Sequence, residues 1–401
     1  MPRFRMPTAG TPYTIAEIAR GLMGFNSQPQ VYRQFTARLK QLLKTDSLAL
    51  VNSGTTANYL LYQLFLQNRN RSEQDEVLMP AYTAPSLLLP LQAAGLRCRL
   101  VDIDPETFNI DRHQIAASVN RRTLAIMPVH MFGLPCDVPS IMELVSQTDI
   151  FVVEDAASSF GSQLGDRQTG TLAPFGFYSL NRGKNISTLA GGIITWQDHA
   201  LTSQIKQLVA NLPILTPGER LMQAMRLVGL SLAVRPFFYT LLGPLVARYK
   251  YTTLHSHFDS FGYTPLQAAL GERLFRRAEA LTERRVVNGR FLRTLFSTIP
   301  GVVVARELPN ARVAYNQFPV VIANLEKRSA LQTRLLADGL ETTLLYEQPL
   351  HEIFPHLNPG GTDPFPAATY LARHLLLIPS HAQIGPAHWR RITAAVRYVF
   401  G

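Results

Sequence analysis

Short apolar runs alternate with amphipathic helical patterns through the first half of the chain, and this alternation limits the possible folds more than any other feature. Polar or turn-forming residues bound each run, and apolar residues recur at helical spacing between them. The runs are residues 48–51, 76–79, 99–103, 123–129, 149–153, 176–180 and 192–196. Strands that alternate with helices predict an α/β fold with a doubly wound, mainly parallel sheet.

The pattern changes after Gln197, and the rest of the chain predicts a smaller domain. One long helix is expected over 266–296, followed by a mixture of short strands and helices. We expect a large domain over 1–250, with an apolar insertion at about 205–258, and a small α+β domain over 251–401. A chain of 401 residues is long enough for two domains.

Composition excludes several classes of protein. The net charge is +11, but the arginines are dispersed and no zinc-finger or RNA-binding aromatic pattern occurs, so no nucleic-acid partner is expected. No run reaches the roughly 18 apolar residues of a membrane-spanning helix, and no secretory signal is visible. Cys98 and Cys136 lack metal-ligand spacing, so we expect no metal and a cytoplasmic protein.

Two segments at predicted strand ends could hold a flat, phosphorylated ligand. Asn52-Ser-Gly-Thr-Thr56 lies between a strand and a helix, where free N–H groups and hydroxyls form an anion site. An ordinary helix N-cap is the alternative. Glu154-Asp155-Ala-Ala157 follows an apolar run, at the edge where open α/β sheets bind ligands. A solvated strand end or a cap is the alternative there.

Lys184 is the third candidate, because it is the only lysine between Thr45 and Ile205. Arginine stays protonated, whereas a desolvated lysine can lose its proton and attack a carbonyl carbon. Taken alone, Lys184 is better explained as a surface lysine. The nearby pair Gly191 and Gly192 allows close approach of a ligand or strand, with a plain turn as the alternative.

Together these segments meet the requirements of one cofactor, pyridoxal 5′-phosphate (PLP). PLP needs a lysine for covalent attachment, a carboxylate at its pyridine nitrogen and a cradle for its phosphate. The residues that supply these groups, in that order, are Lys184, Asp155, and Gly54, Thr55 and Thr56 with Ser179. The coincidence of all the segments favours a PLP site over their separate alternatives.

The same segments resemble the DegT/DnrJ-type PLP-dependent sugar aminotransferases, which have the aspartate aminotransferase fold (fold type I). The resemblance is dense from about Gly10 to Asp198 and resumes at Leu266. The motifs that carry it include Asn52-Ser-Gly-Thr55, Pro80-Ala-Tyr-Thr83, Pro128-Val-His-Met-Phe-Gly133, Glu154-Asp-Ala-Ala157, Tyr178-Ser179 with Lys184-Asn185, and Leu377-Ile-Pro-Ser-His381.

The resemblance implies a role for each matching residue. Lys184 would hold PLP and move the substrate proton, Asp155 would keep the pyridine nitrogen protonated, and Ala157 would pack on a face of the ring. Gly54, Thr55, Thr56 and Ser179 would bind the phosphate.

Three features depart from the family pattern. One is the stretch Ser260-Phe-Gly262, which replaces an Asn-Tyr-Arg segment whose Asn reaches the partner subunit's phosphate in relatives. Ser158 stands where glutamine or histidine is usual, and it is included among the cofactor-binding residues. Ala84 stands where many relatives carry an aromatic residue over the ring, so Tyr82 is expected to stack instead.

The resemblance also implies an activity. The enzyme would transfer an amino group, from glutamate, to a nucleotide-linked keto-sugar for polysaccharide, glycoconjugate or antibiotic sugars. It would be a homodimer with its site at the subunit interface. The alternatives are a PLP-dependent sugar dehydratase and a non-catalytic regulatory protein. The dehydratase branch has histidine at the lysine position, so Lys184 favours transamination.

The apolar insertion is the distinctive part of the sequence. Basic residues flank clusters of Leu, Phe and Tyr within 220–249 and just beyond it. They are Arg226, Arg235, Arg248 and Lys250. This composition suggests contact with an anionic membrane surface or a lipid-linked substrate. A helical pair that forms a dimer contact or covers the core is the alternative.

Overall fold

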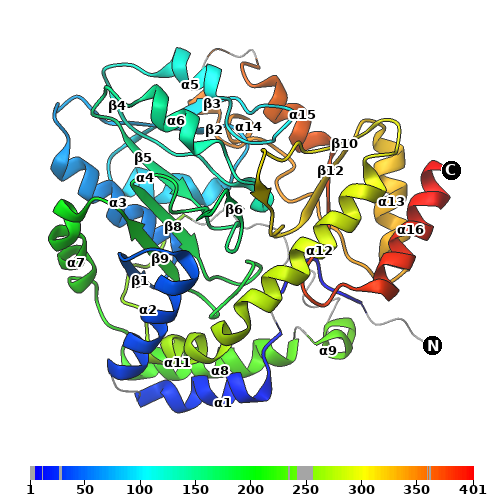
Figure 1. Cartoon of the computed structure of the whole chain (residues 1–401), viewed down its shortest axis with the longest axis horizontal. Coiled ribbons are helices and arrows are strands. Elements are labelled where there is room, and N and C mark those ends of the chain that lie inside the picture. The colour runs from blue at the N-terminus through cyan, green and yellow to red at the C-terminus, as the bar shows by residue number, and fades with distance from the viewer. Residues whose placement is uncertain are drawn as a thin grey trace.

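A seven-stranded sheet forms the centre of the large domain in the computed structural model (Figure 1). The structure describes residues 5–10, 12–26, 29–233, 235–241, 256–358, 360 and 363–401. In spatial order the strands are β1 (Leu48–Val51), β9 (Gly192–Trp196), β8 (Phe175–Ser179), β5 (Phe151–Asp155), β4 (Thr123–Ile126), β2 (Glu76–Pro80) and β3 (Arg97–Val101). Only β9 runs antiparallel to its neighbours in this sheet. The predicted α/β class and mainly parallel sheet are therefore confirmed.

Helix α3 (Gly54–Asn68) lies in the interior of the large domain. It packs against β8, β9 and the helices α4 (Leu88–Ala93) and α7 (Thr202–Ala210). Its buried residues occur on every side, as expected of a helix surrounded by protein. The other helices of this domain include α1 (Ile15–Met23), α2 (Pro29–Leu43), α5 (Arg112–Ser118) and α6 (Val138–Leu144).

The smaller domain is built on an antiparallel sheet of β10 (Val302–Val304), β12 (Phe318–Ile322) and β13 (Leu375–Ile378). Figure 1 shows its helices on the right of the molecule. They are α12 (Ala278–Phe296), α13 (Leu325–Ala337), α15 (Pro366–His374) and α16 (Pro386–Phe400), with the short α14 (Leu350–Ile353) nearby. This arrangement matches the predicted α+β domain.

The single helix predicted over 266–296 is wrong. The structure has α11 (Pro265–Leu274), a 3₁₀ turn (Phe275–Arg277) and then α12. Phe275 is fully buried, and its ring packs edge-on against Phe35 and Phe160. The periodicity of the sequence continues through the turn and cannot reveal this tertiary contact. Helix α11 packs against α1 and α2 of the large domain, and the domain boundary at 250/251 stays a prediction.

A second small sheet was not predicted. It consists of β6 (Gln163–Leu164), β7 (Arg167–Gln168) and β11 (Ala311–Arg312). Strand β11 lies far along the chain but pairs with β6, so this sheet ties the two halves of the chain together. Strands of two residues carry too little pattern to be read from a sequence.

The apolar insertion contains α8 (Pro217–Ala233) and α9 (Pro236–Leu241), while residues 242–255 lie outside the described residues. The inner face of α8, with Ala224, Leu227 and Ser231, is buried, and the helix packs against α1. α8 therefore forms part of a helical layer with α1 and α11, which lies at the bottom of Figure 1. No helix in the described parts of the chain is long and apolar enough to cross a membrane.

Asp102, directly after β3, links the large domain to α15. Its two carboxylate oxygens accept hydrogen bonds from the backbone N–H groups of Ala367 (3.0 Å) and Ala368 (2.8 Å) in the first turn of that helix. Asp102 is buried, so its removal leaves these N–H groups without a partner. We predict that Asp102→Ala lowers the free energy of unfolding by about 2 kcal/mol.

Urea unfolding would measure this loss, with Asp111→Ala as the matched control. Asp111 caps α5 through the N–H of His113, but this contact lies within one domain and near the surface. The control should lose about 1 kcal/mol, as for an ordinary cap. An Asp102→Ala loss no larger than this would contradict a role for Asp102 in joining the domains.

Candidate active site

The predicted site residues line a cavity that lies where the two domains meet. It has a volume of about 420 Å³ and is lined by the carboxyl ends of β5 and β8, the start of α3, and residues of the C-terminal half of the chain. The ends of parallel strands form the usual ligand site of an open α/β sheet. The predicted Lys184, Asp155, Gly54, Thr55, Ala157, Ser158 and Ser179 all line this cavity.

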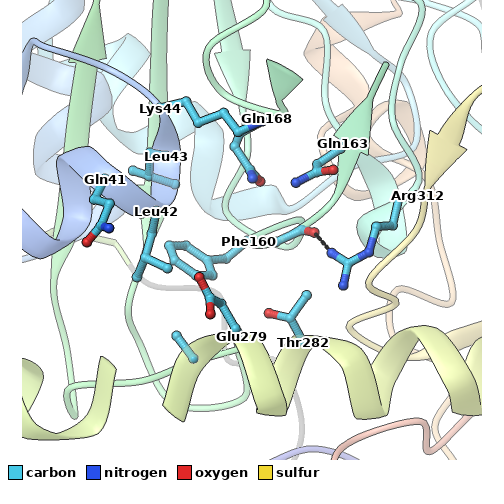
Figure 2. A pocket seen from close by; sticks show the side chains of 12 residues that line it. Gln41, Leu42, Leu43, Lys44, Phe160, Gln163, Gln168, Glu279, Thr282 and Arg312 are labelled. Carbon is cyan, nitrogen blue, oxygen red and sulfur yellow. Dashed lines mark hydrogen bonds between the residues drawn. The ribbon is translucent and has the colours of Figure 1, made fainter. Parts of the chain in front are cut away.

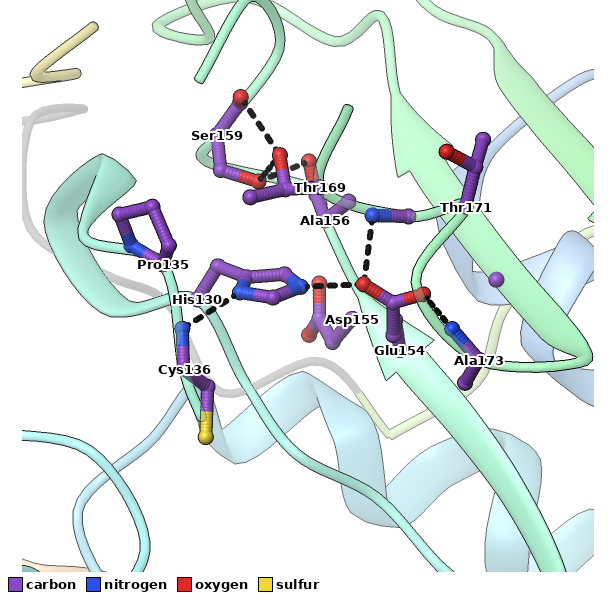
Figure 3. Close-up of polar contacts among 12 residues, drawn as sticks. His130, Pro135, Cys136, Glu154, Asp155, Ala156, Ser159, Thr169, Thr171 and Ala173 are labelled. Atoms are coloured by element: carbon purple, nitrogen blue, oxygen red, sulfur yellow. Dashed lines mark hydrogen bonds and ion pairs between the residues drawn. The ribbon is translucent and has the colours of Figure 1, made fainter. Parts of the chain in front are cut away.

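The two adjacent acids at the end of β5 have different surroundings. Successive residues of a strand point to opposite faces of its sheet, so Glu154 and Asp155 cannot face the same ligand. Asp155 lines the cavity. Glu154 is fully buried and accepts hydrogen bonds from the N–H groups of Gly170 (2.7 Å) and Ala173 (2.6 Å) (Figure 3). Glu154 therefore holds the 170–173 loop, and Asp155 alone is available to a ligand.

His130 completes the buried group around Glu154. Its Nδ1 accepts a hydrogen bond from the N–H of Cys136 (2.9 Å), so Nε2 carries the proton and donates it to Glu154 (2.8 Å) (Figure 3). Neither side chain is exposed to solvent. The backbone N–H of His130 also donates to the carbonyl oxygen of Asp155 (3.0 Å), which holds the end of β5 in place.

Lys184 and Asp155 form the electrostatic centre of the cavity. Burial lowers the pKa of the Lys184 amine, and the negative charge of Asp155 offsets part of that decrease. Burial also raises the pKa of Asp155, against the opposing effects of Lys184 and of the Ala157 N–H, which donates to Asp155 Oδ1 (2.8 Å). Lys184 Nζ donates to Ser158 Oγ (3.0 Å). The lysine is therefore easier to deprotonate than an exposed one.

The start of α3 forms an anion cradle beside Lys184. Ser53 caps the helix, with its Oγ accepting from the Thr56 N–H (3.0 Å). Gly54 and Thr55 line the cavity next to Ser179. A Cβ on Gly54 would lie 3.1 Å from Ser179 Cβ, so only glycine leaves this approach open. The N-cap interpretation is confirmed, because Ser53 is the cap, while the anion site at the N–H groups that follow it stays a prediction.

Two predicted cofactor residues do not line the cavity. Thr56 is fully buried, and its hydroxyl donates to the carbonyl oxygen of Asp259 (3.3 Å). Tyr82 is fully buried in the core, where its ring lies 6.3 Å from that of Phe132 and 5.9 Å from that of Tyr346. The structure thus gives Thr56 a role in supporting the cradle, and it places Tyr346 rather than Tyr82 at the cavity wall.

Sequence reasoning missed the part of the cavity that comes from distant segments. These lining residues are Thr8, Ala9, Asn181, Arg182, Asn316, Gln317, Thr343, Leu345 and Tyr346. Seven of the nine lie more than 100 residues from Lys184, whereas Asn181 and Arg182 lie between Ser179 and Lys184 but had no predicted role.

A second, smaller cavity of about 170 Å³ lies between α2, α12 and the 160–168 segment (Figure 2). Phe160, Gln163, Gln168 and Arg312 line it, and Arg312 donates to the carbonyl oxygen of Gly161 (3.2 Å). None of the predicted cofactor residues reaches this cavity. The chemistry predicted from the sequence is therefore confined to the larger one.

Several of the similar proteins are named as enzymes that act on sugars. GDP-4-keto-6-deoxy-D-mannose 3-dehydratase of Yersinia pseudotuberculosis is 25% identical over 87% of this chain and 86% of its own. GDP-perosamine synthase of Caulobacter vibrioides is 35% identical over 39% of this chain and 41% of its own. The structure of PseC, an aminotransferase of Helicobacter pylori, superposes with a TM-score of 0.79 at 19% identity, covering 99% of both chains.

A family model covers nearly the whole chain, from residue 22 to residue 397. The match includes both domains and every residue assigned above to the cofactor cradle and its lysine. This chain belongs to the DegT/DnrJ/EryC1/StrS aminotransferase family.

Proposed function

We propose that this protein transfers an amino group from glutamate to a nucleotide-linked keto-sugar. The chain is a sugar aminotransferase of a PLP-dependent family. The observation that carries the proposal is the convergence of Lys184, Asp155 and the Gly54–Ser179 cradle on one cavity. A lysine, a carboxylate and a neutral phosphate cradle are the donor set that PLP requires, so the residues present fit this cofactor.

Each of these residues has a defined task. Lys184 Nζ would hold the cofactor, Asp155 would face its pyridine nitrogen, and the N-terminus of α3 with Ser179 would bind its phosphate. When bound, PLP withdraws electrons from the substrate carbon that loses a proton. Burial lowers the pKa of Lys184, so its amine loses a proton more readily than that of an exposed lysine, and the neutral Nζ would accept this proton and return it. Ser158 would orient Nζ through its hydrogen bond.

The acceptor and the donor are inferred from the lining of the cavity and from the relatives. Hydroxyl and amide side chains dominate the polar lining, including Thr8, Thr343, Asn316 and Gln317, and these groups suit the hydroxyls of a sugar. The names of two similar proteins refer to GDP-linked sugars, which supports a nucleotide-linked acceptor. We place the product in polysaccharide, glycoconjugate or antibiotic sugar synthesis.

The proposed enzyme is a cytoplasmic homodimer. Both cysteines are free thiols, as expected in a reducing compartment. The segment before α11 lies beside the cradle, with the Asn52 side chain donating to the carbonyl oxygen of Asp259 (2.6 Å). Relatives often carry an Asn-Tyr-Arg stretch here that reaches the partner subunit, whereas this chain has Ser260-Phe-Gly262, so the homodimer is proposed from the family resemblance as a whole and not from this segment.

The alternative reaction is a dehydration, which one similar protein carries out according to its name. Lys184 argues against it, because the resemblance associates dehydration with histidine at this position. A non-catalytic regulatory role would give no reason for a buried lysine opposite a buried carboxylate. Product analysis with glutamate as donor separates amination from dehydration.

Lys184→Ala should abolish covalent attachment of the cofactor. The wild-type protein with PLP should show the visible absorbance band of a lysine-bound cofactor, and glutamate should bleach it. Lys184→Ala should lack the band and lose at least about 10³-fold in transamination rate, because no other lysine lines the described cavity. Lys206→Ala, on the exposed face of α7, is the control and should behave like the wild type. An identical band in Lys184→Ala would disprove this assignment.

The electrostatics of the site predict how cofactor attachment depends on pH. Only the neutral amine attacks PLP, so attachment increases as pH rises through the pKa of Lys184. Because burial lowers this pKa, the midpoint should lie below that of an ordinary lysine. Asp155→Asn removes a negative charge that raises the pKa, so the midpoint should move to still lower pH.

The rate at which the visible band forms on the PLP-free protein, measured at saturating PLP across pH, gives this midpoint. Glu143→Gln, on the exposed surface of α6, removes the same charge far from the cavity and should leave the midpoint unchanged. A midpoint that rises in Asp155→Asn would show that Asp155 does not act on Lys184 by its charge.

We also propose that the helices of the insertion contact an anionic membrane surface. Residues 205–258 contain six Lys and Arg but one Glu. The outer face of α8 exposes Leu221, Met222, Met225, Val228 and Leu232, and α1 exposes Ile15 and Met23. More than half of the exposed large apolar side chains among the described residues lie on α1, α8 and α9. An apolar face within a basic segment favours lipid binding.

Vesicle sedimentation tests this contact. The wild type should bind phosphatidylglycerol vesicles but not phosphatidylcholine vesicles, and Met225→Glu with Val228→Glu should lower the bound fraction roughly tenfold. The control, Leu144→Glu with Val303→Glu, alters equally exposed apolar residues elsewhere and should still bind. Absence of wild-type binding, together with dissociation of a dimer in the first variant, would make this face a subunit contact instead.

A further inference from the structure

Arg182 is the one charged residue of the large cavity that the cofactor does not explain. The charged side chains in the lining formed by the described residues are Asp155, Lys184 and Arg182. The first two interact with each other and are assigned to the cofactor. Arg182 has no carboxylate within ion-pair distance among the described residues. An unpaired guanidinium at a binding cavity is a candidate for recognition of an oxyanion.

The loop that carries Arg182 has a defined backbone. The N–H of Arg182 donates to Asn181 Oδ1 (2.8 Å), and the N–H of Asn181 donates to Ser179 Oγ (3.3 Å). Gly183 has a φ of +82°, which turns the chain between Arg182 and Lys184. The N–H of Lys184 then closes the turn on the carbonyl oxygen of Asn181 (3.3 Å). The two cations are therefore held two residues apart at the same cavity wall.

Burial differs sharply between the two ends of the cavity. Asp155 and Ser179 are 4% and 9% exposed, whereas Arg182 is exposed. Lys184 is half-buried, so exposure increases from Asp155 through Lys184 to Arg182, and Arg182 lies nearest to solvent. A substrate must direct its reacting carbon toward Lys184, so its remote end lies nearer to solvent and to Arg182.

We propose that Arg182 binds the oxyanion at the remote end of both substrates. This inference rests on the proposed function. The groups concerned are the diphosphate of the nucleotide-linked sugar and the side-chain carboxylate of glutamate. A planar carboxylate and a tetrahedral phosphate each present a pair of oxygens that a guanidinium can bind through two parallel hydrogen bonds. Because donor and acceptor occupy the same cavity in turn, one cation serves both.

The test compares Arg182→Gln with the wild type, loaded with PLP. The glutamate concentration that half-bleaches the visible band should rise roughly tenfold, as expected for loss of one charge-assisted hydrogen-bonded contact. Inhibition of this reaction by GDP and by UDP should weaken by a similar factor, because the base is not recognised by Arg182. Arg182→Lys should lie between the two proteins. Added salt should weaken glutamate binding more in the wild type than in Arg182→Gln.

Arg121→Gln is the matched control. Arg121 is exposed before β4, at the end of the strand opposite to the cavity, and its loss changes the net charge equally. Its half-bleaching glutamate concentration and its inhibition by GDP and UDP should equal those of the wild type. If Arg182→Gln leaves both the half-bleaching glutamate concentration and the inhibition by GDP and UDP unchanged, the inference is overturned. A change for glutamate alone would refute the role in binding the diphosphate, and a change for the nucleotides alone would refute the role in binding glutamate.

Two further outcomes are distinguishable from these. A weaker visible band in Arg182→Gln at equal PLP would show that the arginine serves the cofactor phosphate, which overturns the inference. A wild-type protein with no band, or with one that glutamate leaves unchanged, would refute the proposed function itself.

Discussion

The buried carboxylate of Glu154 is the interaction on which the active-site architecture depends. It accepts two backbone hydrogen bonds from the 170–173 loop and a third from His130. A buried carboxylate without these partners would cost several kcal/mol, so the loop and the 130–136 segment are held in one arrangement. The alternation of side chains along β5 then directs the next residue, Asp155, into the cavity. The buried Glu154 carboxylate therefore positions the Asp155 carboxylate, which faces the cavity.

The opposition of Lys184 and Asp155 determines the chemistry of the cavity. Burial destabilises the charged form of each group, and the opposite charge of the other group offsets part of this effect. As a result, Lys184 loses its proton more readily than an exposed lysine, and its protonated form is stabilised by the neighbouring Asp155 carboxylate. The mostly uncharged lining around them leaves Arg182 as the available charge for a substrate anion. In the proposed mechanism, cofactor chemistry and substrate recognition are therefore separated along the depth of one cavity.

Much of the fold and of the cofactor site could be predicted from local sequence. Every predicted strand of the large sheet exists, and Lys184, Asp155 and Gly54 converge as expected. Local pattern failed where a distant contact decided the outcome. The ring of Phe275 packs against Phe35 and Phe160 and breaks a helix that is continuous in periodicity. The hydroxyl of Thr56 and the ring of Tyr82 are occupied by partners elsewhere in the chain.

The sequence by itself determined the class of fold and the identity of the reactive groups. Hydrophobic periodicity, the position of glycines and the single lysine between residues 45 and 205 are local properties, and their chemistry does not depend on distant partners. The tertiary structure alone decided which of two adjacent acids reaches the ligand, which residues of the distant 316–346 segment line the cavity, and how deeply each charge is buried. These features depend on packing between segments far apart in the chain, and desolvation exists only once that packing is complete.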